Sequence, residues 1–156
     1  MSQRASTREE YTESPIILTT VRVVAPFVLT YGLFITLHGA DTPGGGFQGG
    51  VVIGTTVLLL AFAFGIDPTR EWVGHRVIAI LAGGGVIIFT LVGYATMALG
   101  GAFLEYERFP IPDAPKWGME AVEIGGIAAI ISGVVMALFF LTAAGYQDPD
   151  EVDSDD

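Results

Sequence analysis

Long apolar runs alternate with short polar segments along this chain. A helix crosses the hydrocarbon layer of a bilayer with about 20 residues, so apolar runs of about that length predict transmembrane helices. Four such runs lie at about residues 16–37, 50–66, 77–103 and 119–144. Charged residues gather mainly at 1–13, 67–76, 105–123 and 148–156. The pattern predicts an all-α integral membrane protein with four transmembrane helices and a glycine-rich loop between the first two.

Residues at the ends of these runs fit helix termini. Ser14 suits an N-cap and Pro15 suits the first helical position. Pro68 cannot continue the second helix, and Gly145 suits the C-terminus of the fourth. The first run would be about 33 Å long, and its apolar core exceeds the 7–15 residues of a signal peptide. We therefore expect it to be retained as a span.

We expect three parts in the chain. A polar N-terminal tail occupies residues 1–14, a four-helix membrane domain occupies 15–145, and an acidic, disordered tail occupies 146–156. Only 15% of the residues are charged, whereas a soluble domain has about 25%. This shortage agrees with a membrane protein.

The net charge of −10 arises largely from the last nine residues, six of which are acidic. Such a run stays solvated because it cannot bury apolar area. We favour a solubilising tail, of the kind that salt-loving prokaryotes use, over a docking tail for a basic partner. Nucleic-acid binding is excluded, since phosphates require lysine and arginine. Cysteine is absent, and the histidines and acids have no metal-ligand spacing, so we expect no metal and no cofactor.

Positive charge predicts the orientation of the helices. The N-terminal tail and segment 67–76 contain four arginines, whereas the segments on the other side, 38–49 and 104–118, contain only Arg108 and Lys116. Cytoplasmic segments carry the excess of lysine and arginine. We therefore expect both termini in the cytoplasm and the glycine-rich segment near the outer face of the cell membrane.

The glycine-rich segment consists of Pro43, Gly44, Gly45, Gly46, Phe47, Gln48, Gly49 and Gly50. It contains a G-x-G-x-x-G pattern, but a dinucleotide site needs a preceding strand and an acid about 20 residues later. A membrane helix precedes this segment instead, and no acid follows before Asp67. One interpretation is a tight connection, stiffened by Pro43 and anchored by Phe47. The other is that its backbone, with Gln48, lines a hydrated path or contacts a neighbouring subunit.

The stretch "LFITLHGADTPGGGFQGGVVIG" resembles the corresponding part of the MnhB/MrpB family, one of the components of the Mrp/Mnh multisubunit sodium/proton antiporter. The resemblance includes the order of four spans and covers about residues 16–144. It implies a non-enzymatic subunit that completes a membrane assembly, with Na⁺ and H⁺ as the transported ions and antiporter-like subunits as partners. Those partners would carry most of the proton transfer.

The resemblance has one departure. Many bacterial members have a Phe-Asp-x-Gly-Val pattern in the fourth span, where this chain has "EAVEIGG". The role of that aspartate is therefore not carried over to Glu123. Related subunits also occur in membrane-bound hydrogenase-type complexes, so an MnhB-like component of such an ion pump is an alternative, as is a purely structural scaffold.

Ionisable residues within membrane helices are candidates for an ion path. Glu120 and Glu123 are three residues apart on one helix face; they either face the helix dipole as first-turn acids or border a cation or proton route, Glu123 being the deeper. Arg22 either extends its side chain to the interface or pairs with an acid. His38 is either an interfacial histidine or a proton relay.

Small residues recur every four positions along the fourth span. They are Ala121, Gly125, Ala129, Gly133 and Ala137. Such a stripe permits close approach of helices in lipid. The partners of the stripe would be either the other three helices or neighbouring subunits.

Overall fold

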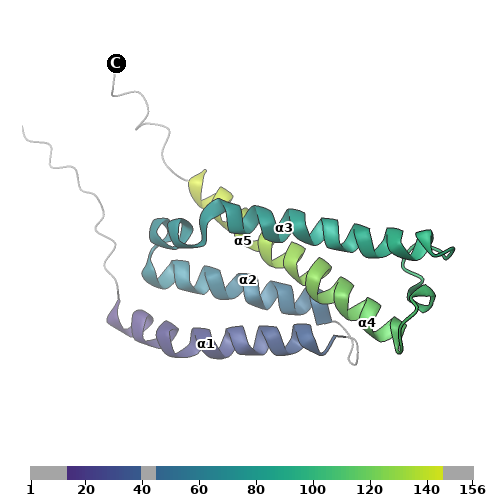
Figure 1. The fold of residues 1–156 in the computed structure, drawn as a ribbon. Helices are drawn as coiled ribbons and strands as arrows, with labels where there is room; N and C mark the ends of the chain where they lie inside the picture. Colours follow the sequence, from purple (N-terminus) through teal and green to yellow (C-terminus); the bar gives the residue numbers. More distant parts are fainter. Residues whose placement is uncertain (1–13, 40–44, 146–156) are drawn as a thin grey trace, which may run out of the picture.

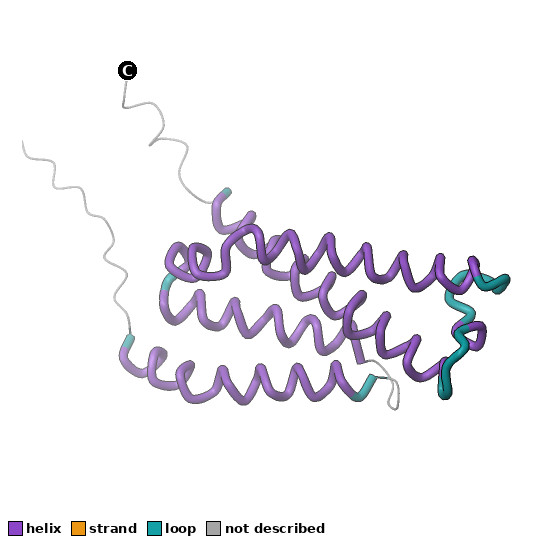
Figure 2. Tube along the Cα trace, viewed as in Figure 1, coloured by secondary structure: helices purple, strands orange, loops and turns teal. Residues whose placement is uncertain are grey.

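A computed structural model describes residues 14–39 and 45–145. The two tails at 1–13 and 146–156, and Pro43 and Gly44 of the glycine-rich segment, lie outside the described residues. Figures 1 and 2 show a bundle of helices, and the described ranges contain no strand. Four helical segments are long and apolar enough to cross a membrane. The prediction of an all-α, four-span fold is confirmed.

The first two spans are α1 and α2, and the third is part of α3. Their bounds are Pro15–Leu37, Gly45–Phe64 and Ile66–Ala98. The fourth is one continuous helix made of α4 (Ala114–Glu120), the π-helical segment η2 (Ala121–Ala128) and α5 (Ala129–Ala144). A short 3₁₀ helix, η1 (Tyr106–Arg108), lies in the connection before it.

The fourth span lies between α2 and α3. It contacts both of these helices along η2 and α5, whereas α1 packs chiefly on α2. In Figure 1 it runs obliquely across the other two. The fourth span therefore determines how the halves of the bundle fit together.

Two helix starts differ from the predicted limits. α2 begins at Gly45 rather than near residue 50, because the glycines form its first turns. Glycine costs about 1 kcal/mol per residue in an isolated helix, but close packing against two neighbours offsets this cost here. α3 begins at Ile66, so most of segment 67–76 is helical; its axis breaks at Gly74, whose φ of 69° favours glycine.

Glycines on α2 bring its backbone against the fourth span. A Cβ atom on Gly46 would lie 2.5 Å from the carbonyl oxygen of Glu123, and one on Gly50 would lie 2.8 Å from that of Ala128. A Cβ on Gly54 would lie 2.9 Å from the Val135 side chain. Since van der Waals packing drives helix association in lipid, these close approaches hold α2 to the fourth span.

The opposite side of the fourth span meets α3 in the same way. A Cβ on Gly133 would lie 2.9 Å from the backbone nitrogen of Ala82, and one on Gly85 would lie 2.7 Å from the carbonyl oxygen of Gly126. Both faces of the fourth span are thus packed against another backbone.

Replacing a packed glycine should cost stability, whereas replacing an exposed one should not. Gly50→Ala is expected to lower the free energy of unfolding by about 1–3 kcal/mol because its methyl group overpacks the helix contact. A Cβ at Gly83 meets nothing within 4 Å, so Gly83→Ala should be neutral or stabilise by up to about 1 kcal/mol through helix propensity. Unfolding titrations in detergent micelles measure both; equal effects would contradict the packing.

The turn before the fourth span is held by Glu105. Its Oε2 accepts a hydrogen bond from the backbone N–H of Ala102 at 2.6 Å, and its Oε1 accepts one from Nε of Arg108 at 2.9 Å. The Ala102 hydrogen bond, followed by that of Arg108, lowers the pKa of Glu105 below its ordinary 4.5. Buried Thr96 donates to the carbonyl oxygens of Gly93 and Ala102 and fixes the other side of the turn.

This turn should loosen in acid. A lowered pKa means that the Glu105 carboxylate stabilises the folded turn above pH 4.5, and that this stabilisation is lost as pH falls through the lower folded pKa. Hydrogen exchange of the Ala102 amide, corrected for intrinsic rates, should show protection that falls in this range. Glu105→Ala should remove both the protection and its pH dependence; protection that persists in this variant would refute the role of Glu105.

Candidate functional site

The candidate site lies where α1 ends, α2 begins and the fourth span passes. Gly39 and Gly45 approach so closely that a Cβ atom on Gly39 would lie 2.6 Å from Cα of Gly45 and would overlap Oε2 of Glu123. The neighbouring Gly46 contacts the backbone of Glu123 itself. Three backbone segments therefore meet around one carboxylate, and we call Gly39, Gly45, Gly46 and Glu123 the glycine junction.

The carboxylate of Glu123 is the chemically active group at the glycine junction. Its Oε2 is buried and accepts no hydrogen bond from any described residue. Leaving a buried acceptor unsatisfied costs about 1–3 kcal/mol, and more for a charged group. Such a group calls for an explanation beyond packing, such as a role in transport or catalysis.

The start of α2 offers this carboxylate a favourable electrostatic environment. Oε2 of Glu123 lies 3.0 Å from the position of a Cβ on Gly45, the first residue of α2. The first N–H groups of a helix have no partner within the helix and carry the positive end of its dipole. The junction thus suits a carboxylate that can hold a proton or one cation.

The π-helical segment η2 brings Glu123 into register with α2. Contacts advance four residues along α2, from Gly46 to Gly50, while they advance five along the fourth span, from Glu123 to Ala128. A π-helix has i→i+5 hydrogen bonds and thus accommodates the extra residue. Segments of this kind are frequent at functional sites.

The structure separates the other charged candidates from the glycine junction. The nearest atoms around Gly39 and Gly45 come from Glu123 and not from Glu120. Arg22 lies near the other end of α1, where its guanidinium is 5.5 Å from the centre of the Phe64 ring, a cation–π distance.

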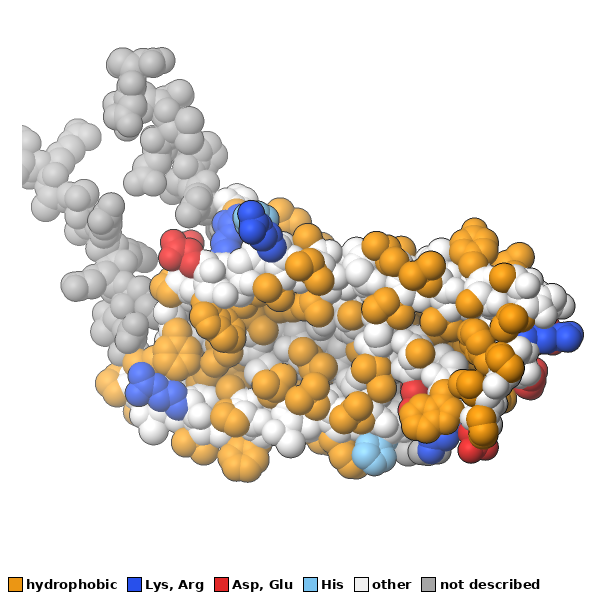
Figure 3. Space-filling view, in the orientation of Figure 1, with side chains coloured by type: hydrophobic (Ala, Val, Ile, Leu, Met, Phe, Trp, Pro, Cys, Tyr) orange, Lys and Arg blue, Asp and Glu red, His pale blue; other side chains and the backbone are white. Residues whose placement is uncertain are grey.

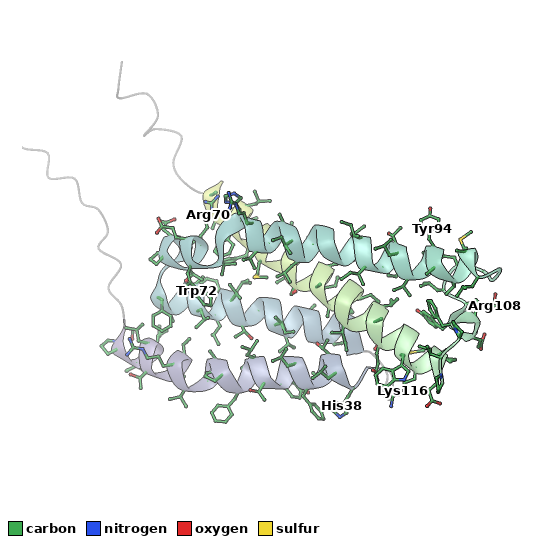
Figure 4. All side chains as sticks on the ribbon, viewed as in Figure 1. His38, Arg70, Trp72, Tyr94, Arg108 and Lys116 are labelled. Atoms are coloured by element: carbon green, nitrogen blue, oxygen red, sulfur yellow. The ribbon has the colours of Figure 1, made fainter. Side chains whose placement is uncertain are left out.

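His38 is exposed at the end of α1 that leads into the junction (Figure 4). Its Nδ1 lies 3.0 Å from the carbonyl oxygen of Phe34, which can accept a hydrogen bond from it, and its ring packs on the Phe34 ring at 4.2 Å.

The glycine-rich segment divides into a packed face and an exposed face. Gly45, Gly46, Gly49 and Gly50 are buried, and Gly49 packs against Thr36 of α1. Phe47 and Gln48 are exposed. The amide of Gln48 therefore does not line the glycine junction.

The small-residue stripe of the fourth span does not follow one face. Gly125 faces Ile88 and Gly133 faces Ala82, both on α3, while Ala121 is exposed and Ala129 and Ala137 are half-buried. A π-helix has more residues per turn than an α-helix, so a four-residue spacing drifts around the helix across η2.

Two features of the site had no clear signal in the sequence. One is Gly39, which follows His38 and allows the contact with Gly45. The other is Tyr106, whose ring packs on Gly118 near the start of the fourth span. Burial, and to a smaller degree the charge of Glu123, raises the pKa of Tyr106 above its ordinary 10. Among the described residues, no three histidines, aspartates or glutamates cluster in a way that could hold a metal ion.

Comparisons with known proteins agree with this architecture. A family model described as a domain related to the MnhB subunit of Na⁺/H⁺ antiporter matches residues 16–145. The second (B) component of the Na⁺/H⁺ antiporter of Bacillus subtilis is 25% identical over 134 residues, which are 83% of this chain and 93% of that protein. An uncharacterised protein of Methanocaldococcus jannaschii is 32% identical over 142 residues, 85% of this chain but 53% of that protein, so the chain spans about half of this relative.

The family match begins in the first span and ends just after the fourth, so it includes all four membrane helices and the glycine junction. The chain belongs to the MnhB family.

Proposed function

We propose that the chain is a non-enzymatic membrane subunit of a multisubunit Na⁺/H⁺ antiporter, and that Glu123 at the glycine junction borders the route of an ion. Membership of the MnhB family supports the first part. The second part depends on one observation: Oε2 of Glu123 is buried without a hydrogen-bond donor among the described residues, beside the start of α2.

A carboxylate in this environment can exchange a proton or hold a monovalent cation. Ionisable groups inside membrane proteins are costly and commonly mark ion or proton pathways. Backbone that lacks side chains, as at Gly39 and Gly45, permits close approach of a small ion to the carboxylate. Glu120 and His38 would then lie along the approach to the junction rather than in it.

A complete exchange of two ions needs more ionisable groups than this bundle supplies. The partners are therefore other membrane subunits of the antiporter, and the transported ions are Na⁺ and H⁺. The arginines of segment 67–76 support an orientation in the cell membrane with both termini in the cytoplasm and the glycine junction toward the outer face.

A purely structural role is the second candidate, and the glycine packing favours it. Both faces of the fourth span are in close contact with neighbouring backbones. A subunit of this kind could stabilise the complex without contacting an ion. The two roles differ in whether transport can be lost while assembly is kept.

Glu123→Gln separates the two roles. The amide keeps the size of the side chain but neither ionises nor exchanges a proton, so sodium-driven proton movement in vesicles should fall by at least about tenfold, equal to about 1.4 kcal/mol in the barrier. The amount of assembled complex, measured by co-purification of its subunits, should stay the same.

Glu107→Gln is the matched control, since Glu107 is exposed in η1 and outside the junction. It should leave both transport and assembly unchanged. Normal transport in Glu123→Gln would remove this residue from the ion route. Parallel loss of assembly and transport would favour the structural role.

A further inference from the structure

A groove with a polar rim lies between the start of α3 and the end of α5. Its apolar lining consists of Ile78 on α3 with Ala137, Phe140 and Leu141 on α5. Its polar lining consists of Arg70 and His75. We call this surface the rim groove. It is at the opposite end of the bundle from the glycine junction, and the proposed ion route does not use it.

The rim of the groove carries charges of both signs. An adjoining hollow is lined by Asp67, Arg70, Glu71, Gly74, His75 and Arg76. Within the described ranges, none of these side chains forms an ion pair or a hydrogen bond with another side chain. In Figure 3, blue and pale blue side chains gather at this end of the molecule with red atoms beside them. Their charged groups are therefore available to an external partner of mixed charge.

The position of the rim groove matches the membrane interface. The first turns of α3, Ile66–Val73, precede the break at Gly74 and carry the exposed Trp72. Figure 4 shows Arg70 and Trp72 at this same end of the bundle. Tryptophan is enriched where hydrocarbon meets headgroups, and Trp72 is 75% exposed. The charged rim would then be level with the headgroups, and the apolar part would face the hydrocarbon layer.

We propose that the rim groove binds one phospholipid molecule. Its phosphate lies between Arg70 and His75, and one hydrocarbon chain lies along Ile78, Ala137 and Leu141. Arginine and histidine are suited to phosphate oxygens. Asp67 and Glu71 face the outer part of the headgroup, where an ammonium group complements them. Basic pockets between transmembrane helices are known to bind lipid headgroups.

Native mass spectrometry of the full chain, released from detergent micelles, tests this site. The probes are dioleoyl phosphatidylethanolamine and dioleoylglycerol, which have the same chains and no net charge but differ in the phosphate headgroup. One phosphatidylethanolamine per chain should be retained more strongly than dioleoylglycerol. Equal retention of the two would show a groove without headgroup recognition, such as one covered by a partner helix, and would overturn the proposal.

Arg70→Gln tests the phosphate contact. It should weaken retention of phosphatidylethanolamine about fivefold, the effect expected for one basic residue near a lipid headgroup. Arg22→Gln is the matched control, because Arg22 has the same charge, lies on α1 toward the same end of the bundle and does not line the groove. Equal weakening in both variants would mean unspecific attraction and would contradict the site.

Ala137→Leu tests the hydrocarbon contact, since the larger side chain fills the groove. It should lower retention of phosphatidylethanolamine while the elution volume and the helical circular dichroism stay unchanged. Excess inorganic phosphate distinguishes a lipid site from a free-phosphate site. Phosphatidylethanolamine that stays bound in its presence supports a lipid site; complete displacement, or full retention in Ala137→Leu, would overturn it.

Discussion

Backbone-to-backbone contact along the fourth span is the constraint on which this structure depends. In lipid, helices gain little from burying apolar surface, so association depends on how closely their backbones approach. Gly46, Gly50 and Gly54 provide that approach on the α2 side, and Gly85 and Gly133 provide it on the α3 side. Because the fourth span is held from both directions, its register fixes the positions of the side chains that it carries.

Glu123 is the residue most affected by this register. The π-helical turn places its backbone against Gly46 and its carboxylate against Gly39 and Gly45. The same close packing that stabilises the bundle thus buries a carboxylate oxygen that no described residue satisfies. The energetic cost of that burial is a reason to regard the glycine junction as functional rather than only structural.

The sequence predicted the fold well, because four apolar runs separated by charges leave few alternatives. It predicted the importance of Glu123 and of the glycine-rich segment, but not their contact. Glycine's low helix propensity favoured a loop at residues 45–49, whereas tertiary packing makes them the first turns of α2. The π-helix has no local signal in "AVEIGGIA", so the four-residue stripe could not indicate which small residues face which helix. Arg70 and His75 gained significance only when the fold brought α5 beside them.

The most direct test of the account is an experimental map of the assembled complex in a lipid bilayer, at a resolution that shows carboxylates. The account predicts that the Glu123 carboxylate lies between Gly39 and Gly45, with Gly46 against its backbone and a π-helical turn at residues 121–128. A Glu123 side chain that extends into bulk water or lipid headgroups, with Gly39 and Gly45 apart, would contradict it.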